Sequence, residues 1–227
     1  MIPKSAFCVL IPAFNEENNI ARVVSEVLSL GYAVVVVDDG STDDTCEIVS
    51  ALAVPCLTSS VNEGKGSAIQ RGFDWFLKER FEALIIMDAD GQHRTEELER
   101  FTAAIQDGRG DLIVGNRMTN PVGMSWIRIL TNRTMSSMIS AAAKQRISDT
   151  QCGYRALTKQ AVAKIELSTK HFEVESEMLL RASGAGLRIA SIPIESVYHD
   201  EISRIRPAQD TLRFFKFFIR FLFCRKL

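Results

Sequence analysis

The sequence lacks the features that identify several large classes of protein. Its five cysteines form no Cys-x-x-Cys pair and are odd in number, which argues against a disulfide framework or a zinc cluster and fits a reducing compartment. The N-terminal apolar run Phe7–Ile11 ends at Pro12 and is too short for a signal peptide, and no stretch reaches the ~18 apolar residues of a membrane-spanning helix. Lysine and arginine number 27 against 28 aspartates and glutamates, which argues against a basic nucleic-acid-binding protein. Because 46% of the 227 residues are hydrophobic, we expect a folded chain with a substantial core.

The charge is distributed unevenly along the chain. Residues 204–227 carry seven basic side chains and one acidic one, so they contribute +6 and the remainder of the chain −7. Six of the 13 phenylalanines fall within Leu212–Phe223. On a helix, Arg213, Lys216 and Arg220 would lie within about 60° of one another and leave a wide aromatic face. This pattern predicts an amphipathic C-terminal helix on an anionic membrane surface; a helix packed on the domain, or a contact between two copies, is the alternative.

Strand and helix patterns alternate along the first half of the chain. The strand patterns are continuous β-branched and apolar runs, which are typical of strands buried on both faces. The alternation predicts an α/β fold, a mostly parallel sheet with helices on both faces, whose ligands bind beyond the carboxyl ends of the strands. We expect one domain over residues 1–207, followed by the amphipathic helix over 208–227. The predicted strands are Ala6–Ile11, Ala33–Val37, Val54–Leu57, Ala83–Met87, Asp111–Val114, a short strand within 149–157, Arg188–Ile192 and Glu195–Tyr198, and the predicted helices are Ile20–Leu30, Asp44–Leu52, Ser67–Arg80, Thr95–Gln106, Trp126–Ala143, Lys159–Ile165, Glu173–Ala182 and one from about Ala208.

Acidic residues follow three of the predicted strands. Glu16 comes after the first strand, Asp38 and Asp39 end the second, and Asp88 and Asp90 follow the third. Because the carboxyl ends of parallel strands meet at one edge of a sheet, we expect these carboxylates to converge. Like charges at such an edge repel unless cations or hydrogen-bond donors compensate them. The sequence therefore favours a divalent metal ion and a polar ligand at this edge.

The segment from Asp88 to Gln92 is the candidate metal site. Asp88, Asp90 and Gln92 alternate, so in an extended segment their oxygen atoms can face one ion. Mg²⁺ and Mn²⁺ favour such oxygen ligands and leave positions open for water and phosphate. The alternative is a simple turn, because Asp and Gly are common turn residues.

Two other loops are candidates for contact with the ligand. A carboxylate of Asp38 or Asp39 could accept hydrogen bonds from a nucleobase or a ribose hydroxyl, and capping of the next helix is the alternative reason for this polar loop. Lys65 lies between Gly64 and Gly66 at a predicted helix start. Glycines there would let the backbone approach a phosphate, although the spacing is not that of a Walker A loop.

Nine short motifs follow one another along the chain. They are Ile11–Glu17, Val36–Ser41, Asn62–Gly66, Asp88–His93, Gly115–Arg117, Asn132–Thr134, Asp149–Arg155, Phe172–Glu175 and Ser203–Pro207. Each is modest alone, but nine in this order are specific. With them the chain resembles family 2 glycosyltransferases, and among these the dolichyl- or polyprenyl-phosphate sugar transferases, of which the dolichol-phosphate mannose synthases are the best known.

The resemblance implies a GT-A fold that binds a nucleotide-diphosphate sugar, such as a GDP- or UDP-sugar. It assigns the nucleoside to the residues that follow the first two strands, namely Pro12, Phe14, Asn15, Glu16, Asp38 and Asp39. It assigns Mg²⁺ or Mn²⁺ at the diphosphate to Asp88, Asp90 and Gln92, and Asp88 and Lys65 would also contact the donor. The residues expected to act in catalysis at the metal and the phosphates are Asp90, Arg117, Arg133 and Arg206.

The resemblance also implies a reaction. We expect inverting, metal-dependent transfer of a sugar to a dolichyl or undecaprenyl phosphate at the cytoplasmic face of a membrane. The departing nucleoside diphosphate carries negative charge that a metal ion and arginines can stabilise. A phosphate acceptor is largely ionised near neutral pH and needs arginine partners, whereas an alcohol needs a general base. The chain offers arginines and acids, so a hydroxyl acceptor on a polysaccharide or other glycan is the alternative.

Two other classes of protein share some of these residue patterns. A signalling receiver domain would use strand-end acids and a lysine, but it has no use for the alternating ligands from Asp88 to Gln92. An inactive nucleotide-sugar-binding subunit conflicts with chemically competent residues at every presumed ligand position. A membrane-protein partner or a homo-oligomer stays open.

Overall fold

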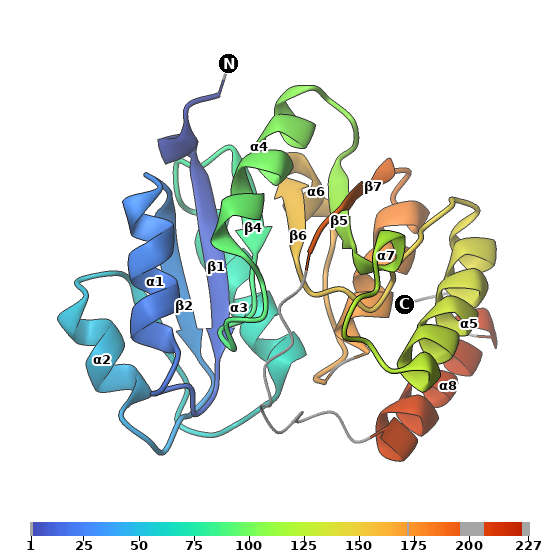
Figure 1. Ribbon diagram of the computed structural model, residues 1–227, viewed down its shortest axis with the longest axis horizontal. Helices are drawn as coiled ribbons and strands as arrows, with labels where there is room; N and C mark the ends of the chain where they lie inside the picture. The colour runs from blue at the N-terminus through green and yellow to red at the C-terminus, as the bar shows by residue number, and fades with distance from the viewer. Residues whose placement is uncertain (1, 172, 196–206, 224–227) are drawn as a thin grey trace.

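Buried apolar runs form one seven-stranded sheet in the computed structural model, which describes residues 2–171, 173–195 and 207–223 (Figure 1). The strand order is β3-β2-β1-β4-β6-β5-β7. The central strands are buried at all but two positions, Pro12 of β1 and Ala33 of β2, as the continuous apolar patterns predict. The strands are β1 (Phe7–Ala13), β2 (Ala33–Asp38), β3 (Cys56–Thr58), β4 (Ala83–Ile86), β5 (Leu112–Asn116), β6 (Arg155–Thr158) and β7 (Ile189–Pro193).

Helices cover both faces of this sheet (Figure 1). They pack on it through a continuous hydrophobic core that includes β1, β2, β4 and β5. The predicted α/β fold with helices on both faces is therefore confirmed. The helices are α1 (Ile20–Ser29), α2 (Thr45–Ala51), α3 (Lys65–Phe76), α4 (Leu98–Gln106), α5 (Trp126–Ala143), α6 (Lys159–Lys164), α7 (Val174–Gly184) and α8 (Pro207–Phe223), with short 3₁₀ turns at Lys4–Ala6, Thr95–Glu97 and Arg117–Thr119.

Strand direction determines which loops meet. β1 pairs in parallel with β2 and β4, so the segments after these three strands lie at one edge. β6 is antiparallel to both β4 and β5, and β5 therefore runs in the same direction as β4. Consequently the residues after β5 and the residues before β6 reach that same edge. Alternation alone predicted parallel pairing, and β6 is the exception.

Pro12 lies inside β1, although the sequence pattern placed the end of the strand before it. Leu10 accepts a hydrogen bond from the Met87 N–H on the β4 side (3.0 Å). Pro12, two residues on, faces the same side, beyond Leu10, which is the last residue of β1 paired with β4. The missing proline N–H therefore leaves no hydrogen bond of the sheet unmade.

The predicted C-terminal helix is present as α8. Phe214, Phe217 and Phe218 are buried in the core, whereas Phe215 and Ile219 are 39% and 53% exposed. One face of α8 therefore packs on the domain. This agrees with the alternative given above, in which the helix packs on the domain. Within the described ranges, no helix is long and apolar enough to cross a bilayer.

Three expectations fall outside the described residues. They are the strand Glu195–Tyr198 beyond its first residue, the basic pair Arg204 and Arg206, and the end of the C-terminal helix after Phe223.

Candidate active site

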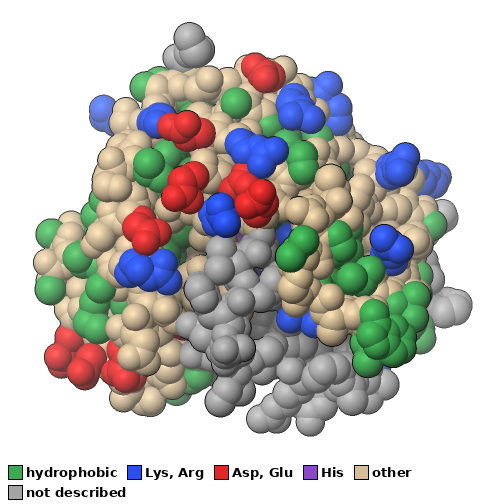
Figure 2. All heavy atoms as spheres, in the orientation of Figure 1, with side chains coloured by type: hydrophobic (Ala, Val, Ile, Leu, Met, Phe, Trp, Pro, Cys, Tyr) green, Lys and Arg blue, Asp and Glu red, His purple; other side chains and the backbone are tan. Residues whose placement is uncertain are grey.

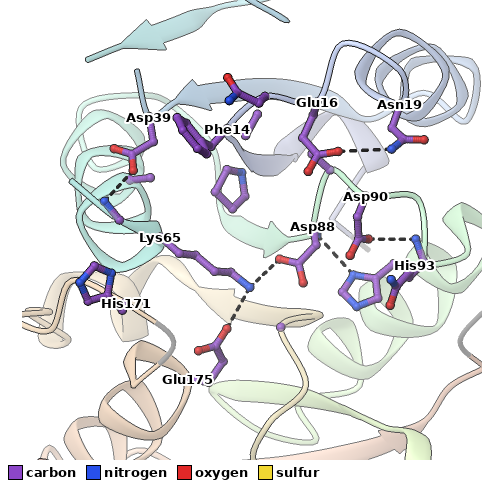
Figure 3. A pocket seen from close by; sticks show the side chains of 18 of the residues that line it. Phe14, Glu16, Asn19, Asp39, Lys65, Asp88, Asp90, His93, His171 and Glu175 are labelled. Carbon is purple, nitrogen blue, oxygen red and sulfur yellow. Dashed lines mark hydrogen bonds and ion pairs between the residues drawn. The ribbon is translucent and has the colours of Figure 1, made fainter. Parts of the chain in front are cut away.

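A cleft of about 620 Å³ lies at the edge where β1, β2, β4 and β5 end. Figure 3 shows side chains from several loops and helices converging on it. The residues that were predicted from the sequence and line this cleft are Pro12, Phe14, Asn15, Glu16, Asp39, Lys65, Asp88, Asp90, Gln92 and Arg117. Asp38 and Arg133 do not line it, and Arg206 lies outside the described residues.

Hydrogen bonds join the loop after β1 to the loop after β2. Asn15 has a positive φ of 52°, a conformation that asparagine tolerates better than most residues. Its backbone N–H donates to Ser41 Oγ (2.9 Å), and its side-chain Oδ1 accepts from the Thr42 N–H (2.8 Å). The Glu16 N–H donates to Thr45 Oγ1 (2.8 Å). These bonds fix the wall of the cleft that contains Phe14 and Glu16.

Asp38 and Asp39 have different environments despite being neighbours. Asp38 is 2% exposed and accepts a hydrogen bond from the Ser41 hydroxyl, so it orders the loop and does not line the cleft. Asp39 lines the cleft, where it accepts from the Gly64 N–H (2.6 Å) and the Arg71 guanidinium (2.7 Å). Of the two carboxylates that the resemblance assigns to the nucleoside, only Asp39 therefore lines the cleft.

Gly64 and Gly66 make room for the chain itself. A Cβ on Gly64 would lie 2.2 Å from the Lys170 carbonyl oxygen, and one on Gly66 would lie 1.9 Å from that of Thr169. The Gly66 N–H donates to the Lys170 carbonyl (2.9 Å). The two glycines therefore admit the 169–170 segment on their Cα side, while Gly64 and Lys65 line the cleft.

This packing gives a testable expectation. Gly66→Ala should lower the free energy of unfolding by about 1–3 kcal/mol, because the new methyl group overlaps backbone that is held elsewhere. The 169–170 segment has little freedom to move, since Glu177 accepts hydrogen bonds from the Thr169 N–H (2.8 Å) and hydroxyl (2.7 Å). Chemical denaturation measures the change. Gly184→Ala is the matched control, since no atom lies within 4 Å of its added Cβ, and it should leave stability unchanged or raise it.

Lys65 joins two carboxylates across the floor of the cleft (Figure 3). Its ammonium lies 2.6 Å from Asp88 Oδ1 and 2.9 Å from Glu175 Oε1. Burial by itself would raise the pKa of Asp88, but the charge and hydrogen bond of Lys65, together with other nearby positive groups, outweigh burial and lower the pKa to about 2. Burial would likewise lower the pKa of Lys65, and the two carboxylates outweigh it and raise it. Gly153 is required beside them, because a Cβ there would lie 2.7 Å from Asp88 Oδ2.

Glu175 is the last residue of the motif Phe172–Glu175. It is 6% exposed at the beginning of α7 and lines the cleft. Its Oε2 atom is buried and has no hydrogen-bond partner. A buried carboxylate oxygen without a donor is costly, so this atom is a natural acceptor for a ligand hydroxyl.

The segment after β4 is ordered by its own hydrogen bonds. The Gln92 N–H donates to Asp90 Oδ1 (2.9 Å), and the Asp88 N–H donates to His93 Nδ1 (3.3 Å). His93 stacks on Tyr154 at a centroid distance of 4.7 Å. Burial lowers the pKa of His93, which favours the neutral ring that this hydrogen bond requires. His93 therefore orients the Asp88–Gln92 segment.

The donor set in this segment fits a hard divalent cation. Burial and the neighbouring Asp88 charge both raise the pKa of Asp90, so the cleft disfavours a second negative charge until a cation enters. Two carboxylates and the Gln92 amide supply oxygen atoms, the ligands that Mg²⁺ and Mn²⁺ prefer. No group of three or more His, Cys, Asp and Glu side chains suited to a metal occurs in the described part of the chain. A cation held by this segment would keep positions for water and phosphate oxygens.

Arg117 enters the cleft from the end of β5 and is held by Asp149. Its Nε and Nη2 atoms donate to the two Asp149 carboxylate oxygens at 2.7 and 3.0 Å. Asp149 is fully buried and also accepts from Asn132 Nδ2 (2.6 Å). The sequence flagged the motif that begins at Asp149 but not this role, because no spacing rule connects residues that are 32 positions apart.

Arg133 is exposed on α5 and lies away from the cleft, whereas Arg128 on the same helix lines it. The two positions are five residues apart, or about 140° around the helix axis. Asn132, Met135 and Ile139 form part of the buried face of α5. Helix phase thus corrects the expectation for Arg133 and identifies Arg128, which sequence reasoning missed.

The chain is similar in sequence to known proteins. Residues 8–166 match the family described as Glycosyl transferase family 2. The chain is 32% identical over 207 residues to a polyprenol monophosphomannose synthase of Mycolicibacterium smegmatis, covering 85% of this chain and 77% of that protein. It is 28% identical over 237 residues to a UDP-N-acetylglucosamine–dolichyl-phosphate N-acetylglucosaminyltransferase of Methanococcus voltae, covering 94% of each.

A solved structure shows the same fold. Glucosyl-3-phosphoglycerate synthase of Mycobacterium tuberculosis, crystallised with Mn²⁺, uridine diphosphate and phosphoglyceric acid, superposes with a TM-score of 0.73. The superposition covers 98% of this chain and 80% of that one at 18% identity. The expected GT-A fold is thereby confirmed.

Proposed function

Because the chain belongs to Glycosyl transferase family 2, we propose that its cleft carries out an inverting, metal-dependent transfer of a sugar from a nucleotide-diphosphate sugar to a polyprenyl phosphate. The observation that carries this proposal is the meeting of Asp88 and Asp90 with Arg117 and Arg128 in one cleft. The carboxylates suit a cation on the donor diphosphate, and the arginines suit a second, phosphate-bearing substrate. Relatives that are named for transfer to dolichyl phosphate or for polyprenol monophosphomannose synthesis support the acceptor class.

The donor would occupy the side of the cleft formed by the loops after β1 and β2. Phe14 offers a ring face and Asp39 a carboxylate held toward the cleft, which suit a nucleobase and ribose hydroxyls. Asp88, Asp90 and Gln92 would hold Mg²⁺ or Mn²⁺, which when bound neutralises charge on the departing diphosphate. The unpaired Glu175 Oε2 would accept a hydrogen bond from a sugar hydroxyl.

The acceptor phosphate would occupy the side of the cleft near Arg117 and Arg128. A phosphate monoester has a second pKa of about 6 and is largely a dianion at neutral pH. It can therefore attack the anomeric carbon without giving a proton to the protein. The Asp149 carboxylate keeps Arg117 in one orientation, so little of its conformational freedom is lost when a phosphate binds. Attack from the face opposite the leaving group inverts the configuration.

We place this reaction at the cytoplasmic face of a membrane. A polyprenyl acceptor lies in a bilayer, and the unpaired cysteines Cys8, Cys46, Cys56 and Cys152 fit a reducing compartment.

The deciding experiment supplies Mn²⁺, a panel of GDP- and UDP-sugars, and either polyprenyl phosphate or the matching polyprenol. We expect product with the phosphate only, and we expect mild acid to release its sugar. Equal transfer to the polyprenol, or transfer to a glycan hydroxyl alone, would replace this proposal with the hydroxyl-acceptor alternative.

The two arginines of α5 give a separate test. Arg128→Ala should raise the KM for polyprenyl phosphate roughly 10- to 100-fold, as expected when a charged hydrogen bond worth about 1.5–3 kcal/mol is lost. Arg133→Ala on the outer face should change it by less than about twofold, since exposed charges contribute little. Initial rates at varied acceptor concentration measure both. The reverse ranking would restore the sequence-based assignment of Arg133.

A further inference from the structure

Exposed apolar side chains gather at the start of α5. Val122, Trp126, Ile127 and Leu130, here called the α5 patch, are 72%, 71%, 58% and 58% exposed. Figure 2 shows hydrophobic side chains clustered at the lower right, over the beginning of this helix. Large apolar residues are common singly on protein surfaces, but a contiguous group of them marks an interaction site.

The α5 patch faces away from the protein core. With ~100° per residue, Trp126, Ile127 and Leu130 lie on the side of the helix opposite Met135 and Ile139, which are buried. Beyond Leu130 the outward positions are polar, since Arg133, Thr134 and Ser137 are exposed there. The apolar outer surface is therefore confined to the first turns of α5, and no core packing accounts for it.

The α5 patch lies across the helix from the cleft. Arg128 lines the cleft, and with ~100° per residue it projects about 160° around α5 from Trp126 and from Leu130. A bilayer that the α5 patch enters would therefore lie about one helix diameter, ~10 Å, from an arginine of the cleft.

The segment that contains the α5 patch carries charged side chains of one sign. Residues 112–148 contain no aspartate or glutamate and five basic side chains, although the whole chain has a net charge of −1. The described side chains of α8 show the same combination, because Phe215 and Ile219 are exposed together with the basic residues Arg213, Lys216 and Arg220. An apolar surface in a positive field complements an anionic lipid surface.

We propose that the α5 patch is a lipid-docking surface, which inserts into the interfacial region of an anionic bilayer and holds the cleft, one helix width away, close to an acceptor phosphate at the headgroup level. The inference rests on the proposed function for the identity of that acceptor, whereas the docking itself does not depend on catalysis. It moves the main membrane contact from the C-terminal segment, where the sequence pattern placed it, to the start of α5.

Tryptophan fluorescence tests the insertion directly. The chain has two tryptophans, Trp75 and Trp126, so Trp75→Phe leaves Trp126 as a single reporter. With vesicles of phosphatidylcholine and phosphatidylglycerol, we expect its emission to shift to the blue and to be quenched by lipids brominated on the acyl chains. An unchanged spectrum with protein bound to the vesicles would mean that another surface docks, and it would overturn the proposal.

Flotation tests the contribution of the α5 patch to binding. Combined Trp126→Gln, Ile127→Gln and Leu130→Gln should reduce the bound fraction on anionic vesicles at least tenfold. Leu28→Gln with Leu77→Gln, the same change at exposed leucines elsewhere, should bind like the wild type. Undiminished flotation of the triple variant would overturn the proposal, as would a wild-type dimer that the triple variant dissociates without any loss of lipid binding.

Activity separates docking from the function on which it rests. With a short, water-soluble prenyl phosphate, the triple variant should keep at least half of the wild-type rate, and with polyprenyl phosphate in vesicles it should lose at least 90%. Equal losses with both acceptors would contradict a docking role. If the wild type glycosylates neither acceptor, the proposed function fails, while fluorescence and flotation still decide whether the α5 patch binds lipid.

Discussion

Asp90→Asn is expected to reduce sugar transfer by roughly 10²–10³-fold or more, the loss seen when one fixed electrostatic contact to a transition state is removed. The amide keeps the shape of the side chain but lacks the charge that would bind a cation. The same change should leave the free energy of unfolding equal or slightly higher. Burial and the Asp88 charge already raise the pKa of Asp90, so the charged form is disfavoured in the empty cleft.

The measurements are initial rates at saturating Mn²⁺ and titration calorimetry of Mn²⁺ with a nucleoside diphosphate. We expect the calorimetric signal of the wild type to be nearly lost in the variant. Asp107→Asn, the same change at an exposed position after α4, should behave like the wild type. Full activity of Asp90→Asn would remove this residue from the cation site and end the metal-dependent mechanism proposed above.

The positions of the strands along the chain and the convergence of the acids were predictable, because the first follows from local apolar pattern and the second from parallel strand direction. Apolar runs such as Val34–Val37 identify buried strands, and parallel direction brings the residues after β1, β2 and β4 together. The sequence did not show on which side of a strand or helix each polar side chain lies. Asp38 is the last residue of β2 and Asp39 begins the loop after it, and only Asp39 lines the cleft. Composition gives no indication of which one.

Phase also separates Arg128 from Arg133, since only the packed position of α5 shows which side faces the cleft. Contacts across long sequence separations were equally beyond reach. Lys65 meets Glu175 at a distance of 110 residues along the chain, and both side chains are largely buried. A pattern-based method sees a glycine-flanked lysine and a helix start, and it has no means to pair them. The antiparallel direction of β6 could not be predicted either, because the direction of a strand depends on the path that the chain takes between strands.

Arg155 shows how such a hidden contact supports the site. It is 1% exposed, and its guanidinium donates to the Cys152, Glu175 and Thr150 carbonyl oxygens at 2.9, 2.6 and 2.9 Å. These bonds connect the segment before β6 to the start of α7. They therefore fix both Gly153 and Glu175 at the floor of the cleft. Burial lowers the pKa of Arg155, which shows that its charge is tolerated at a cost.

Arg155→Met should accordingly lower the free energy of unfolding by about 3–5 kcal/mol, the scale for breaking a buried charged contact. Methionine fills much of the space but donates no hydrogen bond, so three buried carbonyls lose their partner. Arg155→Lys should recover only part of the loss, because one ammonium cannot reproduce the planar fork of the guanidinium. Arg100→Met, at a half-exposed arginine paired with Glu97, should cost less than about 1 kcal/mol. Chemical denaturation measures all three, and the lysine variant keeps the comparison possible if the methionine variant does not fold. If Arg155→Met and Arg100→Met proved equally stable, the buried guanidinium would not be what holds the cleft floor in place.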